Sequence, residues 1–462
     1  MKFYNSLTRQ KEDFIPLEKG KVKMYACGIT PSAEAHIGHL YQALIYDIMR
    51  KFLQKEGFDV TYARNYTDID DKIIAKSNEL NIPAKDYAEE TIKKIDSEMK
   101  LFQIDDPDIW LRATENVDNI IHFVEGLIKK GHAYATKNGD VYFSVNTCPS
   151  YGKLSGRNTR DALDGVRIDN DEEKNDPLDF ALWKSAKPGE PYWKSPWGNG
   201  RPGWHIECSV MNYATFGDQI DIHGGGRDLV FPHHENEIAQ SESLTGKPFA
   251  KYWTHNGLIR VNGQKMSKSL GNSLLMSDLR KSYHIESIKF ALLQNSYHTD
   301  INITDNLFPD AEKHLFEFYK ILQNAQTLGK FEGEDETVGQ NFDIAMRDDL
   351  NTAKALSLLF GIFKTAKEKI ANKDKSVLAT LNSVIKTYSL LGLFKENPDK
   401  FVSYVMSKQD STVPEEVKNL AQERWQAKKD RNFAKADEIR AKISNLGYEV
   451  KDTREGFEIL KK

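Results

Sequence analysis

The sequence predicts an α/β protein built on a parallel sheet, and two stretches carry this prediction. In the first, an apolar strand at residues 22–26 leads through a glycine-bearing turn into an amphipathic helix that starts at residue 37 and ends near residue 57; a second strand follows at 58–67. In the second, residues 218–246 repeat the order of strand, glycine loop and helix. Such units form parallel sheets whose binding sites lie at the carboxyl ends of the strands.

The rest of the chain differs in character from these two stretches. Residues 131–200 hold short segments rich in Gly, Pro and charge, which indicates an insertion between two α/β halves. Residues 311–400 follow helical spacing with no convincing strand, and residues 407–414 are expected to be a linker. A basic helix and a hairpin at 447–460 are expected to close the chain. A length of 462 residues is enough for roughly two to four domains.

The composition excludes several classes of protein. Hydrophobic residues make up 39% and charged residues 29%, and no apolar run approaches the roughly 18 residues of a membrane span. The N-terminus lacks the apolar stretch of a secretory signal. Three cysteines are too few for a disulfide framework and suit a reducing compartment, so we expect a cytoplasmic protein. The net charge of -4 argues against non-specific coating of nucleic acid, although basic residues can still cluster locally.

A metal site is indicated by four residues. His233 and Glu237 stand four apart just after Pro232, so both side chains share one helix face. Cys208 lies 25 positions before His233, and Cys27 ends the first strand; a Cys, Cys, His, Glu set suits Zn²⁺. The spacing leaves an alternative open. In it, His233 and Glu237 only pair with each other on a helix surface, and the cysteines are buried as small apolar residues. Cys148 has no metal-like partner spacing and receives no role.

A nucleotide site is indicated by two further motifs. "HIGH", His36 to His39, opens the helix after the first strand, where unpaired N–H groups favour an anion such as a triphosphate and Gly38 allows close approach to the backbone. Two histidines at a helix start often act only as caps. "KMSKS", Lys265 to Ser269, supplies two lysines on a polar loop that could neutralise the charge that develops on a pyrophosphate.

These motifs together resemble a known family. "HIGH" followed by "KMSKS" is similar to the signature of class I aminoacyl-tRNA synthetases, and "GRPGWHIECSVM", "DIHGGGRDLVFPHHENEIAQSE" and "KMSKSLGN" resemble the cysteinyl-tRNA synthetase family. The similarity runs nearly end to end, through "NYTDIDDKIIAKS" and "AKADEIRAKISNLGYEVKDT". The resemblance implies a Rossmann-type catalytic domain with an inserted connective domain, a helical bundle that binds tRNA, and a small C-terminal domain that binds the anticodon.

The resemblance implies boundaries for these parts. The Rossmann catalytic domain is expected in two halves, 1–130 and 201–270, with the connective insertion at 131–200 and the KMSKS loop in the second half. A stem-contact region at 271–310, the helical bundle at 311–406 and the anticodon-binding domain at 415–462 are expected to follow. Family members are expected to be monomers.

The resemblance also implies a reaction and its residues. Cysteine and ATP, with Mg²⁺, form cysteinyl-adenylate and pyrophosphate, and the cysteine then passes to the 3′ end of tRNA(Cys). One zinc ion would bind the substrate thiolate, and would separate cysteine from serine better than shape alone. The residues that match the family positions are Cys27, Cys208, His233 and Glu237 for zinc; Gly28, Thr67 and Trp204 for the amino acid; His36, Gly38, His39 and Lys268 for ATP; and His36, His39, Lys265 and Lys268 for catalysis.

One stretch departs from the family pattern. Members usually carry "CGPTVYD" before "HIGH", whereas this chain reads "CGITPSAE". "CGITP" is similar to the cysteine ligase of mycothiol biosynthesis, which transfers activated cysteine to an amino-sugar and is expected to lack an anticodon-binding module. Against that alternative, residues 423–442 hold seven Lys or Arg against four Asp or Glu, with Trp425 and Phe433 among them, which suits an RNA loop. A non-catalytic RNA-binding relative would be expected to have eroded "HIGH" or "KMSKS", and both are intact.

Overall fold

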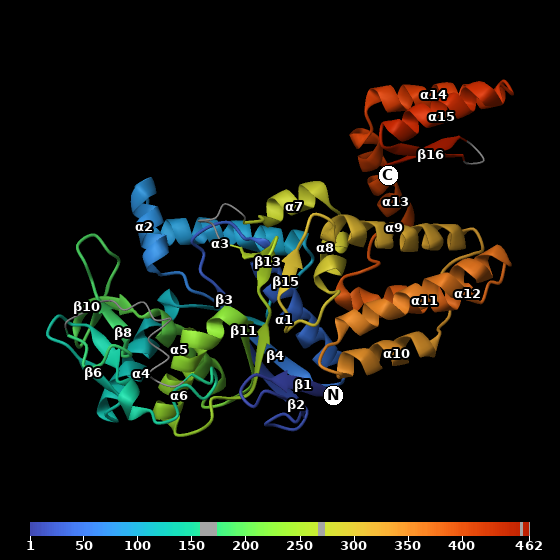
Figure 1. Ribbon diagram of the computed structural model, residues 1–462. Helices are drawn as coiled ribbons and strands as arrows, with labels where there is room; N and C mark the ends of the chain where they lie inside the picture. Colours follow the sequence, from blue (N-terminus) through green and yellow to red (C-terminus); the bar gives the residue numbers. More distant parts are fainter. Residues whose placement is uncertain (158–172, 267–272, 453–455, 462) are drawn as a thin grey trace. The chain divides into compact units, whose positions relative to one another are not determined.

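Figure 1 shows the computed structural model of the chain, which describes residues 1–157, 173–266, 273–452 and 456–461. The described chain divides into two compact units. The first unit comprises Met1–Glu312, Glu334–Ile362 and Ser383–Leu393, and the second comprises Lys313–Gly333, Phe363–Asn382 and Phe394–Lys462. No helix among the described residues is long and apolar enough to cross a membrane.

A five-stranded parallel sheet forms the centre of the first unit. Its strands lie in the order β12-β11-β3-β4-β5. The chain therefore starts in the middle with β3, builds β4 and β5 on one side, and later adds β11 and β12 on the other. The order reverses between β3 and β11, and in such sheets ligands bind outside the carboxyl ends at this switch point. The strands are β3 (Lys21–Ile29), β4 (Asp59–Tyr66), β5 (Ile109–Arg112), β11 (Ile220–Gly226) and β12 (Ala250–Asn256).

Helix α1 (Ile37–Lys55) connects β3 to β4 and confirms the predicted strand–helix–strand unit. Its apolar positions are buried as their helical spacing requires, from Ile37 and Leu40 through to Leu53. The helix ends just before Gly57, whose positive φ of 93° suits the turn into β4. Helices α2 (Asp71–Leu80) and α3 (Ala84–Leu101) link β4 to β5, and a hairpin of β1 (Lys2–Asn5) and β2 (Gln10–Asp13) precedes β3.

A second, antiparallel sheet lies between the two halves of the parallel sheet in the sequence. Its order is β6-β7-β8-β10-β9, and it has a core of its own that includes Phe143, Leu182 and Trp183. Helix α4 (Val117–Lys129) packs its apolar face onto this core. The strands are β6 (Ala133–Ala135), β7 (Val141–Phe143), β8 (Phe180–Ser185), β9 (Trp193–Ser195) and β10 (Gly198–Pro202).

Two helices return the chain to the parallel sheet. Helix α5 (Trp204–Phe216) leads into β11, and α6 (Glu235–Thr245) leads from β11 to β12. Residues of both helices share a core with β3, β4 and β12, through Cys208 and Met211 on α5 and Ile238 on α6. Strands β13 (Ile259–Val261), β14 (Gln264–Lys265) and β15 (Ile301–Ile303) form a small sheet, with α7 (Met276–Ser282) and α8 (Ile285–Leu292) between β14 and β15 in sequence.

The last third of the chain is helical, as its spacing predicts. It contains α9 (Leu307–Gln326), α10 (Glu336–Arg347), α11 (Thr352–Ala371), α12 (Val377–Tyr388), α13 (Pro398–Thr412), α14 (Glu415–Lys429) and α15 (Phe433–Asn445). The linker expected at 407–414 is wrong for most of its length, because α13 continues to Thr412. Asn397 caps that helix and Pro398 occupies its first turn, while Pro414 disfavours helical backbone at Val413 and so ends it. The expected hairpin is confirmed as β16 (Tyr448–Asp452) and β17 (Phe457–Lys461).

Candidate active site

The turn after β3 is built around a very close approach of two backbones. Gly28 N–H donates a hydrogen bond to Asn65 Oδ1 at 2.8 Å, and a Cβ at Gly28 would lie 1.5 Å from the Asn65 carbonyl oxygen. Only glycine fits there without separating β3 from β4. The same approach sets Cys27, at the carboxyl end of β3, beside the switch point of the sheet. The sequence-predicted residues Cys27 and Gly28 therefore lie where parallel sheets bind ligands.

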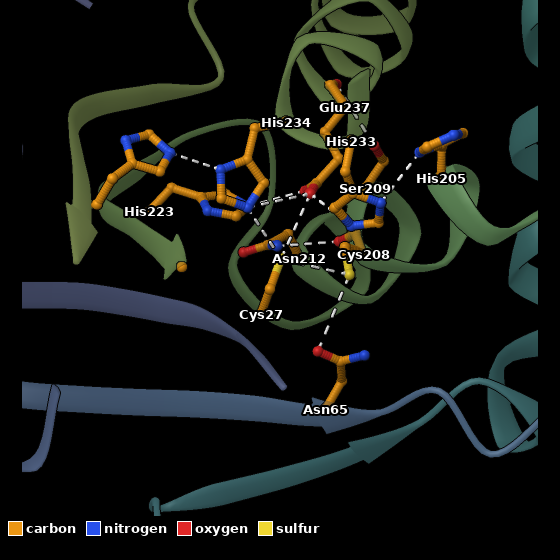
Figure 2. A network of polar contacts seen from close by, with 12 residues as sticks. Cys27, Asn65, His205, Cys208, Ser209, Asn212, His223, His233, His234 and Glu237 are labelled. Atoms are coloured by element: carbon orange, nitrogen blue, oxygen red, sulfur yellow. Dashed lines mark hydrogen bonds and ion pairs between the residues drawn. The ribbon is translucent and has the colours of Figure 1, made fainter. Parts of the chain in front are cut away.

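The four residues predicted as metal ligands come together in the structure (Figure 2). Cys27 lies on β3, Cys208 on α5, His233 in the short helical turn η5 (Val230–His234) that leads directly into α6, and Glu237 in the first turn of α6; all four are buried. Cys27 Sγ is 3.7 Å from Cys208 Sγ and 3.4 Å from Glu237 Oε1, and His233 Nε2 is 3.1 Å from the same Glu237 oxygen. Two sulfurs, an imidazole nitrogen and a carboxylate oxygen, all within 4.8 Å of one another, could hold a metal ion.

A second set of donors, which the sequence reasoning missed, shares two of these residues. Cys27, His223, His234 and Glu237 also place one ligand atom each within 4.8 Å of the others. His223 Nε2 lies 2.8 Å from Glu237 Oε2, and His234 Nε2 lies 3.3 Å from Cys27 Sγ. The available signals were the doubled histidine in "HHEN" and the histidine of "DIHGGG", which the parallel pairing of β11 with β3 brings next to Cys27.

The electrostatics of the cluster follow from its burial. Burial raises the pKa of the Cys27 thiol well above its usual value, whereas the hydrogen bond that Cys27 donates lowers the pKa of Cys208 to about 6. Burial favours neutral His233, but its hydrogen bonds with Cys208 and Glu237 outweigh this and raise its pKa to about 10. Burial likewise opposes charge on Glu237, yet His223 and His233 hold its pKa well below the usual range. Soft and anionic donors gathered in a dry pocket favour a dication.

Further histidines surround the cluster and fix its members. His205 Nδ1 lies 3.0 Å from His233 Nδ1, which leaves His233 Nε2 directed at Glu237. His234 Nδ1 lies 2.8 Å from His255 Nε2, and His255 Nδ1 lies 2.8 Å from Ser6 Oγ. Burial lowers the pKa of His205 well below its usual value and that of His255 to about 3, so both rings are neutral near pH 7. Such outer partners orient metal-binding side chains in proteins.

The predicted amino-acid contacts lie beside the cluster. The Trp204 ring, 41% exposed, is 4.4 Å from the His233 ring between centroids, so it faces open space and does not fill the protein core. Thr67 is buried just after β4, and Asn65 Nδ2 donates to its Oγ1 at 3.4 Å. Asn65 thus contacts Gly28 and Thr67, and its Oδ1 lies 3.9 Å from Cys208 Sγ. Cys27, Gly28, Thr67 and Trp204 therefore border one region of the first unit.

The "HIGH" motif forms the N-terminus of α1. His36 caps the helix by accepting from Gly38 N–H at 3.1 Å, and the rings of His36 and His39 stack with centroids 3.7 Å apart. The capping role that the sequence left open is therefore present, at a helix end that favours anions. A Cβ at Gly38 would meet His36 Cε1 at 3.0 Å, so the turn is tight.

Two described residues, one within the "KMSKS" segment and one beyond it, lie against this same helix start. Met266 Cε would lie 3.5 Å from a Cβ at Gly38, and beyond the segment Ile37 N–H donates to Leu274 O at 2.9 Å. Lys265 belongs by its backbone to β14. Lys268 lies outside the described residues. Met266 and Leu274 therefore lie close to "HIGH", although both are more than 200 residues away from it in the sequence.

A cavity of about 870 Å³ adjoins the cluster in the first unit. It is bordered on one side by Trp204, His205 and Thr30, and on the other by the antiparallel sheet. This volume far exceeds what one small amino acid needs and lies in the range of sites for larger ligands. Charged residues of both signs line it: Asp70, Asp71, Lys72, Asp140, Lys174, Asp179, Lys184, Lys187, Glu190 and Arg201.

Comparisons with known proteins agree with this architecture. Residues 13–313 match the family model of the class I (C) tRNA synthetase catalytic domain, and residues 341–395 match the DALR domain. The cysteine–tRNA ligase of Legionella pneumophila is 43% identical over 98% of this chain and 97% of its own length. That of Syntrophotalea carbinolica is 44% identical over 99% of this chain and 98% of its own.

Solved structures are similar in fold at low sequence identity. Mycobacterium tuberculosis methionyl-tRNA synthetase, solved with methionyl-adenylate, gives a TM-score of 0.61 at 13% identity over 82% of this chain and 93% of that chain. An Agrobacterium radiobacter LeuRS, solved with tRNA and LeuAMS, gives 0.59 at 10% identity over 84% and 88%. The fold, the family models and the full-length relatives agree, and the chain belongs to the cysteine–tRNA ligase family of class I aminoacyl-tRNA synthetases.

Proposed function

We propose that this chain is a cysteine–tRNA ligase. In the first step the cysteine carboxylate attacks the α-phosphorus of ATP, which enters with Mg²⁺, and pyrophosphate leaves. In the second step a ribose hydroxyl of the tRNA 3′ end attacks the carbonyl carbon of cysteinyl-adenylate, and AMP leaves. The observation that carries this proposal is the buried Cys27, Cys208, His233 and Glu237 cluster at the end of β3, the strand that leads into the "HIGH" helix of a class I catalytic domain.

The cluster fits a zinc ion by the chemistry of its donors. Two thiols, an imidazole and a carboxylate are a donor set typical of Zn²⁺, and all four are buried. We assign Cys27, Cys208, His233 and Glu237 as the ligands. When bound, zinc would supply a Lewis acid that prefers the thiolate of cysteine to the hydroxyl of serine. Of the two donor sets, this one leaves His223 to hold Glu237 and His234 to contact Cys27 from outside.

The protein's own residues position the reactants around that cluster. Gly28 and Thr67 line the approach at the ends of β3 and β4, and Trp204 presents its exposed ring beside His233. The N-terminus of α1 would receive the ATP phosphates, with His36, Gly38 and His39 at the contact. Lys265 and Lys268 would neutralise charge on the departing pyrophosphate. Catalysis then consists of positioning and charge stabilisation, with no covalent enzyme intermediate.

The runner-up function, transfer of cysteine to an amino-sugar, is not favoured. The DALR match at residues 341–395 and the basic segment 423–442 lie in the C-terminal part, where the mycothiol-type ligase is expected to lack an anticodon-binding module. We retain as part of the proposal the division into catalytic halves (1–130, 201–270), insertion (131–200), stem-contact region (271–310), helical bundle (311–406) and anticodon-binding domain (415–462). A monomeric state and a cytoplasmic location remain predictions; all three cysteines are free thiols, which suits a reducing compartment.

The test is transfer of radiolabelled cysteine by the purified protein with ATP. One reaction contains tRNA with a GCA anticodon, and a parallel reaction contains the amino-sugar acceptor. Labelled cysteinyl-tRNA without sugar product is expected. Sugar product without charged tRNA would overturn the assignment of the acceptor and leave the zinc and ATP assignments standing, because both reactions begin with the same adenylate.

A further inference from the structure

One carboxylate in the cavity wall holds two cations that would otherwise repel each other. Arg201 and Lys184 are directly opposite on the paired strands β10 and β8. Like charges in that position destabilise a sheet. Asp71 accepts from both: its Oδ1 pairs with Arg201 Nη2, and its Oδ2 lies 3.3 Å from Lys184 Nζ. The two oxygens of Asp71 therefore bridge the two strands.

This bridge joins two separate structures on opposite sides of the cavity. Asp71 is the first residue of α2, four positions after Thr67, which follows β4, and so belongs to the parallel-sheet side. Lys184 and Arg201 belong to the antiparallel sheet. All three line the 870 Å³ cavity, and Arg201 lies three positions before Trp204. A change in the bridge therefore changes how the antiparallel sheet faces the cavity.

The burial of the three residues shows which charge can be removed without leaving a buried charge unpaired. The Arg201 side chain is 7% exposed and also pairs with Glu190, Nε to Oε2 at 3.5 Å. The Asp71 side chain is 56% exposed and that of Lys184 is 35% exposed. Burial alone would raise the pKa of Asp71, but Arg201 and Lys184 hold it below the usual value, so Asp71 is ionised at neutral pH. Removing the Asp71 charge leaves Arg201 paired with Glu190, so the buried guanidinium keeps a partner.

In the proposed reaction, the cavity could hold part of the tRNA acceptor end. Cysteine and ATP react at the cluster and at the α1 N-terminus, whereas the second step needs room beside the adenylate for a nucleotide of the acceptor. The cavity adjoins Trp204 and is large enough for such a group. Its width depends on the bridge, because the bridge ties α2 to the sheet that forms the opposite wall.

Resting on the proposed function, we propose that Asp71, by bridging Arg201 and Lys184, is a positioning residue for the transfer step, which fixes the antiparallel sheet where the tRNA acceptor end enters. Activation of cysteine does not use this wall. Loss of the bridge therefore lowers transfer to tRNA and leaves adenylate formation intact.

The test separates the two steps in Asp71→Asn, which keeps the shape and removes the charge. Cysteine-dependent exchange of pyrophosphate into ATP, measured without tRNA, is expected to stay within about twofold of wild type, while kcat/KM for tRNA charging falls about tenfold. Asp71→Glu is expected to restore most of the charging. Glu79→Gln is the matched control, because Glu79 forms an exposed pair with Lys76 at the far end of the same helix; it is expected to change neither step.

A second pair of measurements tests the bridge itself. Lys184→Met is expected to lower charging, and the double variant with Asp71→Asn is expected to fall much less than the product of the single effects, as for residues that act as one unit. Equal losses in exchange and charging would mean a merely structural role and would overturn the proposal. A lower KM for tRNA in Asp71→Asn would also overturn it, since it would mean that Asp71 competes with the acceptor for the two cations. Wild-type protein without cysteine-dependent exchange would instead refute the proposed function.

Discussion

Cys27 Sγ lies 3.4 Å from Glu237 Oε1, although the two residues are 210 positions apart and lie on different elements of the parallel-sheet unit. A carboxylate buried beside a thiol is costly without a cation, because burial disfavours its charged form. Glu237 Oε2 is held by His223 at 2.8 Å, so the carboxylate is fixed with its other oxygen toward the sulfurs. Together with Cys208 and His233, these groups could hold a metal ion.

Replacing one predicted ligand should lower both zinc binding and the use of cysteine as a substrate. Cys208→Ser is expected to lower the zinc content well below one per chain and to lower kcat/KM for cysteine in pyrophosphate exchange by more than about 100-fold, because hydroxyl is a poor zinc ligand. Metal analysis and exchange kinetics measure the two effects. Cys148→Ser is the control, since Cys148 is partly exposed and contacts Ser150 outside the cluster; equal effects of the two variants would contradict the assignment.

Metal uptake by the apo-protein should release protons and strengthen with pH. Burial raises the pKa of Cys27 above its usual value, so this thiol is protonated at neutral pH and must lose its proton to become a ligand. The thiol keeps its proton over this whole range, so zinc must displace that proton, and the competing proton concentration rises as the pH falls; zinc affinity should therefore fall from about pH 8.5 to about pH 6.5. Zinc titrations in buffers of different ionisation enthalpy measure the protons released, and a proton count of zero would contradict the prediction.

The close approach at Gly28 predicts a large effect of one methyl group. Gly28→Ala must push β4 away from β3, because the new Cβ would lie 1.5 Å from Asn65 O. We expect a loss of about 3 kcal/mol in unfolding free energy and a raised KM for cysteine. Gly361→Ala is the control: a Cβ there meets nothing within 4 Å, and Gly361 lies inside α11. Its unfolding free energy should rise by up to about 1 kcal/mol. Denaturant unfolding measures both.

The second unit should lose stability in acid through one ion pair. Exposed surface pairs contribute little, but Asp452 receives two hydrogen bonds from the buried Arg424, at 2.7 and 3.0 Å, and a third from Lys428. These bonds hold the pKa of Asp452 below its usual value. The pair therefore stabilises the folded unit above about pH 4, and this stability is lost as the pH falls through the lowered pKa.

The variant that tests this pair is Asp452→Asn. It should cost about 1 kcal/mol at pH 7, a figure that allows for solvent screening of a partly exposed carboxylate, and progressively less below about pH 4. Hydrogen exchange of the α14 amides measures this local stability.

The control for this prediction is Glu438→Gln, which removes an exposed pair with Lys442 one turn along α15. It should leave the exchange rates of α14 unchanged at every pH. Equal exchange rates of the α14 amides in wild type and Asp452→Asn at pH 7 would mean that the pair between Arg424 and Asp452 does not stabilise this part of the second unit.

Much of the fold could be predicted because its signals are local. The apolar spacing from Ile37 to Leu53 defines α1, and the i, i+4 relation of His233 and Glu237 brings their side chains to 3.1 Å where η5 leads into α6. The linker expected at 407–414 was wrong because helix capping at Asn397, outside that segment, starts a helix that runs through it.

The rest of the site depends on strand pairing that local patterns do not encode. His223 comes next to Cys27 only because β11 pairs with β3, and Asp71 meets Arg201 and Lys184 only because α2 faces the antiparallel sheet. No spacing in the sequence relates residues that lie so far apart along the chain. The roles of the zinc ligands and of "HIGH" and "KMSKS" came from family resemblance, and they remain predictions until they are measured.

We predict that a metal held by Cys27, Cys208, His233 and Glu237 selects the substrate by its thiolate. The most direct measurement is the ratio of kcat/KM for cysteine over serine in pyrophosphate exchange, for zinc-loaded and metal-depleted protein. Shape alone separates such isosteres by roughly 100-fold. We predict a ratio above about 10⁴ with zinc, since the metal prefers the softer sulfur, and its collapse without zinc. A ratio near 100 that does not respond to metal removal would mean that the metal does not select the substrate.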